Sequence, residues 1–265
     1  MGFDFEITTS IRSDGILRQL KEQTLNHLDL KECQFYMLNK HQDRMLAAIS
    51  AFKWPKILEE KVLDLEEHLH THLASTYGSS AYGNPLKIRV TLSSTGDINI
   101  ASVPVPNVGP MSLFPLSLFN LLEAPYAGVP PTFRVFLSPI PTTPDQFTAH
   151  KSTRRTLYDG VRCFLPPYPS SSSDETPPLE ILLVNHAGQI MEGSFTTPYF
   201  HRGGKWITPA GHCGGNLGTT RRYALERGLC EEGVVVETSV YASEKVVLSN
   251  GARGFGRGIV EELPM

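Results

Sequence analysis

The chain has 265 residues, of which 40% are hydrophobic and 19% are charged, so it can bury the core of one large domain or two modest ones. Its formal net charge is −3 without a long block of one sign, which disfavours nucleic acid or an anionic membrane as the main partner. No apolar run is long enough to span a bilayer, no secretory pattern opens the chain, and the four cysteines are irregularly spaced. We therefore expect a cytoplasmic protein with reduced thiols.

The first half of the chain carries strand and helix patterns in turn. β-Branched and alternating apolar residues predict strands at residues 5–11, 34–38, 86–92 and 98–100. Apolar residues at helical spacing predict helices at residues 40–52 and 57–73. Residues 102–131 are rich in Pro and Leu with weak periodicity, and we interpret them as part strand and part crossing between two domains.

The second half has more strands than helices. The same patterns predict strands at residues 133–137, 180–184, 189–191, 206–209, 234–236 and 245–248. A helix is expected after Lys151, and another over residues 219–227, where Gly228 ends it. Residues 166–173 are predicted to form a surface loop, and the glycines of residues 254–258 a terminal turn. The whole pattern indicates an α+β fold with a small N-terminal α/β domain at 1–120, a connection at 121–131 and a larger domain at 132–265.

Three separated features follow one another in an order that suits one cofactor. Lys151 offers an amine, Glu192 ends a predicted strand, and Gly218 begins a small-residue turn that opens a helix. Pyridoxal phosphate needs an amine for a Schiff base, a carboxylate for its pyridinium proton and N–H groups for its phosphate. Taken singly, each feature is more often a solvated lysine, an exposed carboxylate or an ordinary helix cap. The ordered set therefore carries the hypothesis.

The set resembles the fold-type IV pyridoxal phosphate enzymes, which are the class IV aminotransferase and aminodeoxychorismate lyase superfamily. The resemblance runs from about Phe5 to Gly254, and it rests on His41-Gln42-Asp43-Arg44-Met45, Lys151, Leu182-Leu183-Val184-Asn185 with Gly188, Glu192-Gly193-Ser194, Thr208-Pro209 and residues 214–221. It implies a two-lobed protein whose larger lobe has a β-barrel-like core. It also implies a homodimer, with the active site at the interface.

The resemblance assigns roles to residues of this sequence. Lys151 would form the Schiff base and move the substrate proton, and Glu192 would contact the pyridine nitrogen. Leu217 would pack on the ring. The phosphate would be bound by Arg44, Gly218, Thr219 and Thr220, and the turn of Asn250, Gly251 and Ala252 is a candidate for the facing wall.

Two runs look most like the aminodeoxychorismate lyase branch. They are residues 150–155 followed by Tyr158-Asp159, and Phe5-Glu6 leading to Ser10-Ile11-Arg12. The implied reaction is a β-elimination that releases 4-aminobenzoate and pyruvate, for folate biosynthesis. Ser10 would assist the departing group, and the candidates for binding the substrate carboxylates are Arg89, Arg154 and Arg155. Tyr158 is a further substrate-binding candidate.

Two other hypotheses stay open. A fold-type IV aminotransferase for branched-chain or D-amino acids needs the same Lys151 and Glu192, and a non-catalytic relative would need neither. Thr197-Pro198 departs from the family pattern, which has Asn at the position of Thr197. No metal site is expected, because His68, His70 and His72 are interpreted as a solvated helix face.

Overall fold

The chain folds into two compact units. The computed structural model describes residues 4–17, 34–78, 83–123, 131–167 and 177–263. The first unit comprises Met1–Pro110 and His150–Arg154, and the second comprises Met111–Ala149 and Arg155–Met265. The short segment with Lys151 thus belongs to the first unit, while the residues on both sides of it in the chain belong to the second. The domain limits expected at 120 and 131 stay a prediction.

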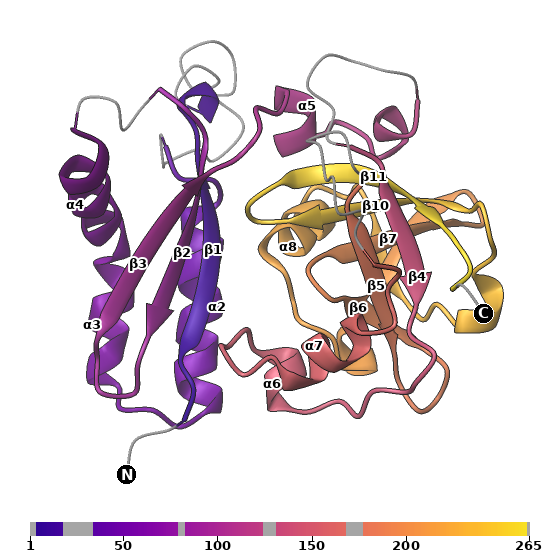
Figure 1. The fold of residues 1–265 in the computed structure, drawn as a ribbon, viewed down its shortest axis with the longest axis horizontal. Coiled ribbons are helices and arrows are strands. Elements are labelled where there is room, and N and C mark those ends of the chain that lie inside the picture. Colours follow the sequence, from indigo (N-terminus) through magenta and orange to yellow (C-terminus); the bar gives the residue numbers. More distant parts are fainter. Residues whose placement is uncertain (1–3, 18–33, 79–82, 124–130, 168–176, 264–265) are drawn as a thin grey trace. The chain divides into compact units, whose positions relative to one another are not determined.

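An antiparallel sheet organises the first unit (Figure 1). Among the described residues it has three strands in the order β1 (Ile7–Ser13), β2 (Leu86–Leu92) and β3 (Ile98–Pro104). Its helices include α2 (Leu38–Ala51), α3 (Ile57–Leu63) and α4 (Leu65–Tyr77), and α2 packs against β1. The alternating residues of β2 project to opposite faces, and Ile88 and Val90 are fully buried. The strand predicted at 86–92 is confirmed at both ends.

Two predictions for the first unit are wrong. Residues 34–38 do not form a strand, because Phe35 makes only an isolated bridge to Ser13 and Met37 takes a left-handed conformation with φ of 55° before α2 begins. The predicted helix at 57–73 is two helices that meet at Asp64. Buried leucines continue at helical spacing on both sides of Asp64, so periodicity alone does not reveal the break.

The described part of the second unit contains an eight-stranded mixed sheet in the order β6-β5-β4-β11-β10-β7-β8-β9. The strands are β4 (Phe133–Leu137), β5 (Leu179–Val184), β6 (Ile190–Gly193), β7 (Thr197–Arg202), β8 (Lys205–Pro209), β9 (Glu231–Gly233), β10 (Lys245–Asn250) and β11 (Gly254–Val260). The pairs β4–β5, β4–β11 and β8–β9 are parallel, and the other pairs are antiparallel.

This larger sheet curls into a half-barrel (Figure 1). The N–H of Ile190 in the edge strand β6 donates to the carbonyl of Val235, just after the opposite edge strand β9, at 2.8 Å. One buried cluster, with Phe133, Val135, Leu182 and Phe200 among its members, packs together in this unit. The expected α+β fold with a barrel-like core in the larger lobe is confirmed.

A second buried cluster covers the other face of β5. Every residue of β5 is buried, which explains why its sequence is an almost continuous apolar run rather than an alternating one. Helix α7 (Thr156–Arg162) contributes Tyr158 and Val161 to this cluster, beside Leu183 and Met191. Other helices among the described residues of the unit are η2 (Phe119–Leu121), α6 (Gln146–Ala149), η3 (Gly211–Cys213), α8 (Thr219–Glu226) and η4 (Glu237–Ser239). Helix α5 (Pro110–Leu113) begins at the last residue of the first unit's range. Within the described ranges, no helix is long and apolar enough to cross a membrane.

Two further predictions are wrong in the second unit. Residues 254–258 are not a terminal turn but belong to β11, which lies between β4 and β10. A Cβ atom on Gly258 would lie 2.6 Å from Val135 Cγ2, so glycine allows neighbouring side chains to pack across the strand. The strand expected at 234–236 lies earlier, at Glu231–Gly233. The predicted loop at 166–173 falls mostly outside the described residues.

Candidate functional site

The backbone of Lys151 is held by the first strand of the first unit. The N–H of Thr8 donates to the carbonyl of Lys151 at 3.1 Å, and the N–H of Thr153 donates to the carbonyl of Glu6 at 2.9 Å. Ile7 and Ser152 form an antiparallel bridge between these bonds. The segment is therefore a short extension of the sheet, and the half-buried Lys151 stands on a fixed backbone.

Arg44 lies in a buried polar group with Thr9 and His41. Its Nη2 atom donates to Thr9 Oγ1 and lies 3.2 Å from His41 Nδ1, while Thr9 Oγ1 and His41 Nδ1 are 2.6 Å apart. Burial lowers the pKa of His41 most, and the positive charges of Arg44 and Lys151 lower it further. A neutral imidazole can accept at Nδ1, so Thr9 and His41 together orient the Arg44 guanidinium. The sequence marked Arg44 but assigned no role to His41.

Ser10 and Arg89 are direct partners across β1 and β2. Directly opposite residues of an antiparallel pair project from the same face of the sheet, so these two side chains are neighbours. Arg89 is exposed and Ser10 is half-buried. The structure therefore brings together two of the residues expected to touch the substrate. Arg154 is exposed and lies in the segment that carries Lys151.

Glu192 lies in β6 of the second unit and has a direct donor. The Tyr158 hydroxyl, from α7, donates to Glu192 Oε1 at 2.6 Å, and both side chains are buried. Burial raises the pKa of Tyr158, and the negative charge of Glu192 raises it further, so the phenol keeps its proton. The sequence had placed Tyr158 with the substrate-binding candidates. In the structure it lies against the carboxylate.

Another carboxylate, Glu180 in β5, organises the turn that follows Glu192. Glu180 is fully buried and accepts hydrogen bonds from Ser194 Oγ at 2.5 Å, Thr196 Oγ1 at 2.7 Å and the Phe195 N–H at 3.1 Å. A Cβ atom on Gly193 would lie 2.7 Å from Thr196 Oγ1, so this tight turn requires glycine. Thus Glu180 fixes the turn directly after Glu192, next to the departure from the family pattern at Thr197.

The start of α8 has the features expected of a phosphate-binding turn. Thr219 Oγ1 is buried and has no hydrogen-bond partner among the described residues. Gly218 precedes it, and a Cβ atom there would lie 2.9 Å from Thr197 Oγ1. Leu217 is 47% exposed. A buried hydroxyl without a partner and an exposed apolar side chain fit a ligand that has both an anionic group and a flat apolar ring.

The loop before α8 packs closely against Glu192. A Cβ atom on Gly215 would lie 2.4 Å from the Met191 carbonyl oxygen and 3.0 Å from Glu192 Cβ. Asn216 Nδ2 donates to the Ala149 carbonyl at 3.2 Å, and Ala149 stands two residues before Lys151 in the chain. The structure thus brings Glu192 and the loop of residues 214–218 together.

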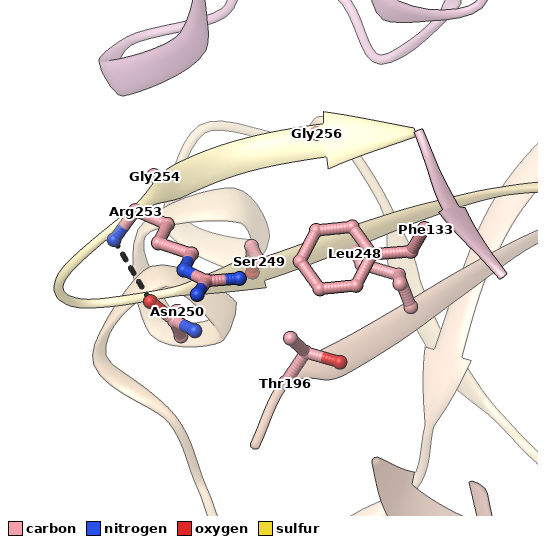
Figure 2. Close-up of a pocket in the computed structure, with 8 residues that line it drawn as sticks. All are labelled: Phe133, Thr196, Leu248, Ser249, Asn250, Arg253, Gly254 and Gly256. Atoms are coloured by element: carbon pink, nitrogen blue, oxygen red, sulfur yellow. Dashed lines mark hydrogen bonds between the residues drawn. The ribbon is translucent and has the colours of Figure 1, made fainter. Parts of the chain in front are cut away.

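The turn between β10 and β11 is closed by its own hydrogen bonds. Asn250 Oδ1 accepts from the N–H groups of Ala252 at 3.0 Å and Arg253 at 2.8 Å. Gly251, between Asn250 and Ala252 in the chain, is buried. Beside this turn is a small hollow, which Figure 2 shows with Asn250 and Arg253 at one end and Phe133 at the other. Its volume of about 10 Å³ suits about one water molecule, so it is too small for a cofactor. Ser249 Oγ, also in its lining, donates to Thr220 Oγ1 at 2.7 Å and so connects the turn with α8.

Arg155 forms a hydrogen bond with the turn that follows Glu192. Its Nη2 atom donates to the Ser194 carbonyl at 3.1 Å. Its guanidinium lies 4.7 Å from the ring centre of Tyr158 and 4.8 Å from that of Phe195, and Arg162 lies 4.3 Å from the same Phe195 ring. Contacts of this kind between a cation and an aromatic face are attractive. They give Arg155 a structural environment that the sequence did not reveal.

The described histidines and cysteines do not gather into a cluster of metal ligands. Among the described residues, no three His, Cys, Asp or Glu side chains lie close enough together to hold a metal ion. His72, one of the three histidines of α4, has its Nε2 atom 2.8 Å from Ser102 Oγ. Cys163, Cys213 and Cys230 are free, and burial raises the pKa of the Cys213 thiol, which disfavours a nucleophilic thiolate there.

Comparison with known proteins identifies the family to which the sequence is similar. The model of the class IV aminotransferases matches residues 27–258. The aminodeoxychorismate lyase of Saccharomyces cerevisiae is 27% identical, in a match that covers 86% of this chain and 68% of that protein.

Two solved structures share the fold at low sequence identity. The 4-amino-4-deoxychorismate lyase of Pseudomonas aeruginosa is 15% identical with a TM-score of 0.60, covering 97% of this chain and 84% of that one. A branched-chain aminotransferase of Thermoproteus uzoniensis is 15% identical with a TM-score of 0.64, covering 98% and 80%. The backbone is thus shared by enzymes of two reaction types, whereas the family match spans most of the sequence. The chain belongs to the class IV aminotransferase family.

Proposed function

We propose that this protein is a pyridoxal phosphate-dependent 4-amino-4-deoxychorismate lyase. The observation that carries the choice of reaction is the similarity to the yeast lyase along 86% of the chain. The runs around Lys151 and Ser10, which resemble the lyase branch, support the same choice. The reaction converts aminodeoxychorismate to 4-aminobenzoate and pyruvate.

The residues of the second unit fit the proposed cofactor. Glu192, with Tyr158 as its hydrogen-bond donor, suits a protonated pyridine nitrogen, because a carboxylate favours that proton through a charge-assisted hydrogen bond. The buried Thr219 hydroxyl at the start of α8 suits a phosphate oxygen, and the exposed Leu217 suits an aromatic ring. When bound, pyridoxal phosphate supplies an electron sink for the carbon next to the substrate nitrogen.

The residues of the first unit supply the proposed proton transfer and charge. Lys151 would hold the cofactor covalently and then take the proton from the ring carbon that bears the substrate amine. The bond from the neighbouring carbon to the enolpyruvyl oxygen breaks, the ring becomes aromatic, and the departing group takes up a proton to give pyruvate. Ser10 would orient or protonate that oxygen. Arg44 would bind the phosphate. Arg89 and Arg154, together with Arg155 of the second unit, are the candidates for the substrate carboxylates.

A direct assay tests the proposal. Wild-type protein loaded with pyridoxal phosphate should convert aminodeoxychorismate to fluorescent 4-aminobenzoate with release of pyruvate, and Lys151→Ala should lose this activity. The wild type should show a visible absorption band that borohydride abolishes, and Lys151→Ala should lack it. Exchange of an amino group between an amino acid and an α-keto acid, without pyruvate from aminodeoxychorismate, would instead establish the aminotransferase. Absence of the band would favour the non-catalytic relative.

The remaining expectations belong to the same proposal. A homodimer with the active site at its interface follows from the family resemblance. Light scattering of the purified protein measures its mass in solution and so tests whether it is a dimer. A cytoplasmic location likewise stays a prediction.

A further inference from the structure

We propose that Tyr158 is a positioning residue for Glu192, and that it acts on the cofactor through this carboxylate rather than by contacting the substrate. This inference rests on the proposed function, since it concerns how Glu192 would hold a pyridinium proton. It changes the role that the sequence indicated for Tyr158.

Packing against buried side chains holds the phenol ring of Tyr158 from one side. Tyr158 belongs to the buried cluster that α7 forms with β5 and β6, where Val161, Leu183 and Met191 are also buried. This packing holds the ring, and its hydroxyl donates to Glu192 Oε1 at 2.6 Å. A second, longer contact of 3.5 Å joins the hydroxyl to the Thr148 carbonyl. The short bond to the carboxylate is therefore the stronger of the two.

Arg155 holds the phenol ring from another direction. Its guanidinium lies 4.7 Å from the ring centre, and its Nη2 atom donates to the Ser194 carbonyl in the turn after Glu192. The same arginine thus joins the ring of Tyr158 to the chain that carries Glu192. A change in the phenol position would have to disturb both contacts. This arrangement keeps donor and carboxylate in one geometry.

The Tyr158 hydroxyl is a hydrogen-bond donor that favours the charged form of the carboxylate. The pKa of Tyr158 is raised by burial and by Glu192, so the phenol remains a donor at physiological pH. A donor to a carboxylate stabilises the ionised form and makes it a weaker base. An ionised Glu192 would leave the shared proton on the pyridine nitrogen of the bound cofactor, where a protonated ring would withdraw electrons best. Loss of the donor would shift that proton toward Glu192 and weaken the electron sink.

The test replaces Tyr158 by Phe in the pyridoxal phosphate-loaded enzyme. Phe keeps the ring that packs against Val161 and Leu183, and the unfolding midpoint of the cofactor-free form reports whether the variant folds. Tyr77→Phe is the matched control, because it also removes one phenol, whose hydroxyl lies 2.9 Å from Ser102 Oγ in the first unit.

For Tyr158→Phe we expect kcat to fall about 10- to 100-fold, the size of the loss of a hydrogen bond to a charged group. KM should change less than about threefold, because the substrate is not contacted. The pH at which the visible cofactor band changes should move by about one unit. Tyr77→Phe should alter none of these values.

A double variant separates an action through Glu192 from an independent effect. If Tyr158 acts through the carboxylate, Tyr158→Phe should lower kcat by less than about threefold when Glu192 is already Gln, since coupled residues are not additive. Equal losses in both backgrounds would overturn the proposal. So would a rise in KM with an unchanged absorption band, which would identify a substrate contact. Failure of the proposed function would be recognised separately, because the wild type itself would then lack the absorption band or the lyase activity.

Discussion

Two carboxylates in neighbouring strands have opposite environments. Glu180 in β5 is fully buried, and its oxygens accept from two hydroxyls and from the N–H groups of Ile181 and Phe195. Glu192 in β6 retains 8% exposure, accepts from the Tyr158 hydroxyl and lies beside the loop of residues 214–218. The first carboxylate is enclosed by its own turn. The second lies where a ligand is expected.

We expect the difference to separate an acid that serves the fold from one that serves the proposed reaction. Removing a buried carboxylate leaves its donors without acceptors, and each such group costs free energy of folding. A carboxylate that awaits a ligand contributes less to folding and more to binding and chemistry. Glu180 should therefore determine stability and Glu192 should determine activity, although the two strands that carry them are neighbours.

The largest expected effect is that of Glu192→Gln on the reaction. Gln can still accept a hydrogen bond from Tyr158, but it has no charge to hold a pyridinium proton. We expect kcat to fall about 100- to 1,000-fold, as for other preorganised charged groups. The unfolding free energy of the cofactor-free protein should change by less than about 1 kcal/mol. Steady-state kinetics and urea denaturation measure both, and retained activity would remove the distinction between the two acids.

Glu180→Gln should reverse this pattern. The new amide presents N–H groups toward donors that the carboxylate had accepted, so we expect a loss of about 2–3 kcal/mol in the unfolding free energy. Measured below its unfolding midpoint, the variant should retain kcat within about tenfold. Urea denaturation with the wild type as reference gives the stability. A stable but inactive Glu180→Gln protein would show that Glu180 serves the reaction directly.

The smallest expected effect is that of a substitution at Thr219, a third buried polar residue to set beside the two carboxylates. Its buried hydroxyl has no partner among the described residues, so Thr219→Val should leave the stability of the cofactor-free protein unchanged or raise it by up to about 1 kcal/mol. Affinity for pyridoxal phosphate should fall about tenfold, as expected for one lost hydrogen bond. Fluorescence titration with the cofactor checks this. Unchanged affinity would mean that the hydroxyl does not meet the phosphate.

The sequence predicted the fold well where one local pattern applied. The strand at 86–92 alternates buried and exposed positions in its first half, and the strand at 133–137 has a short apolar run, and both agree with the structure at each end. The glycines of residues 254–258 misled the prediction. Their small size serves close packing across β11, and a sequence pattern cannot distinguish this from a turn.

In the candidate site, too, some features could be predicted from the sequence and others could not. The order of Lys151, Glu192 and Gly218 was visible because each residue type has its own chemistry, whatever the fold. The environments of Tyr158 and Arg155 were not visible. Both residues stand close to Lys151 in the sequence, and that position suggested a role toward the substrate. In the structure Tyr158 contacts Glu192 itself, and Arg155 contacts Ser194 in the turn that follows.

The sequence by itself determined the family resemblance, the α+β class and the order of the reactive residues, because these depend on residue type and spacing along the chain. Only the tertiary structure decided which side chains surround each acid. Tyr158 and Glu192 are 34 residues apart, and they meet because α7 packs on β5 while β6 pairs beside it. That contact depends on how separate elements pack, and no local pattern records it.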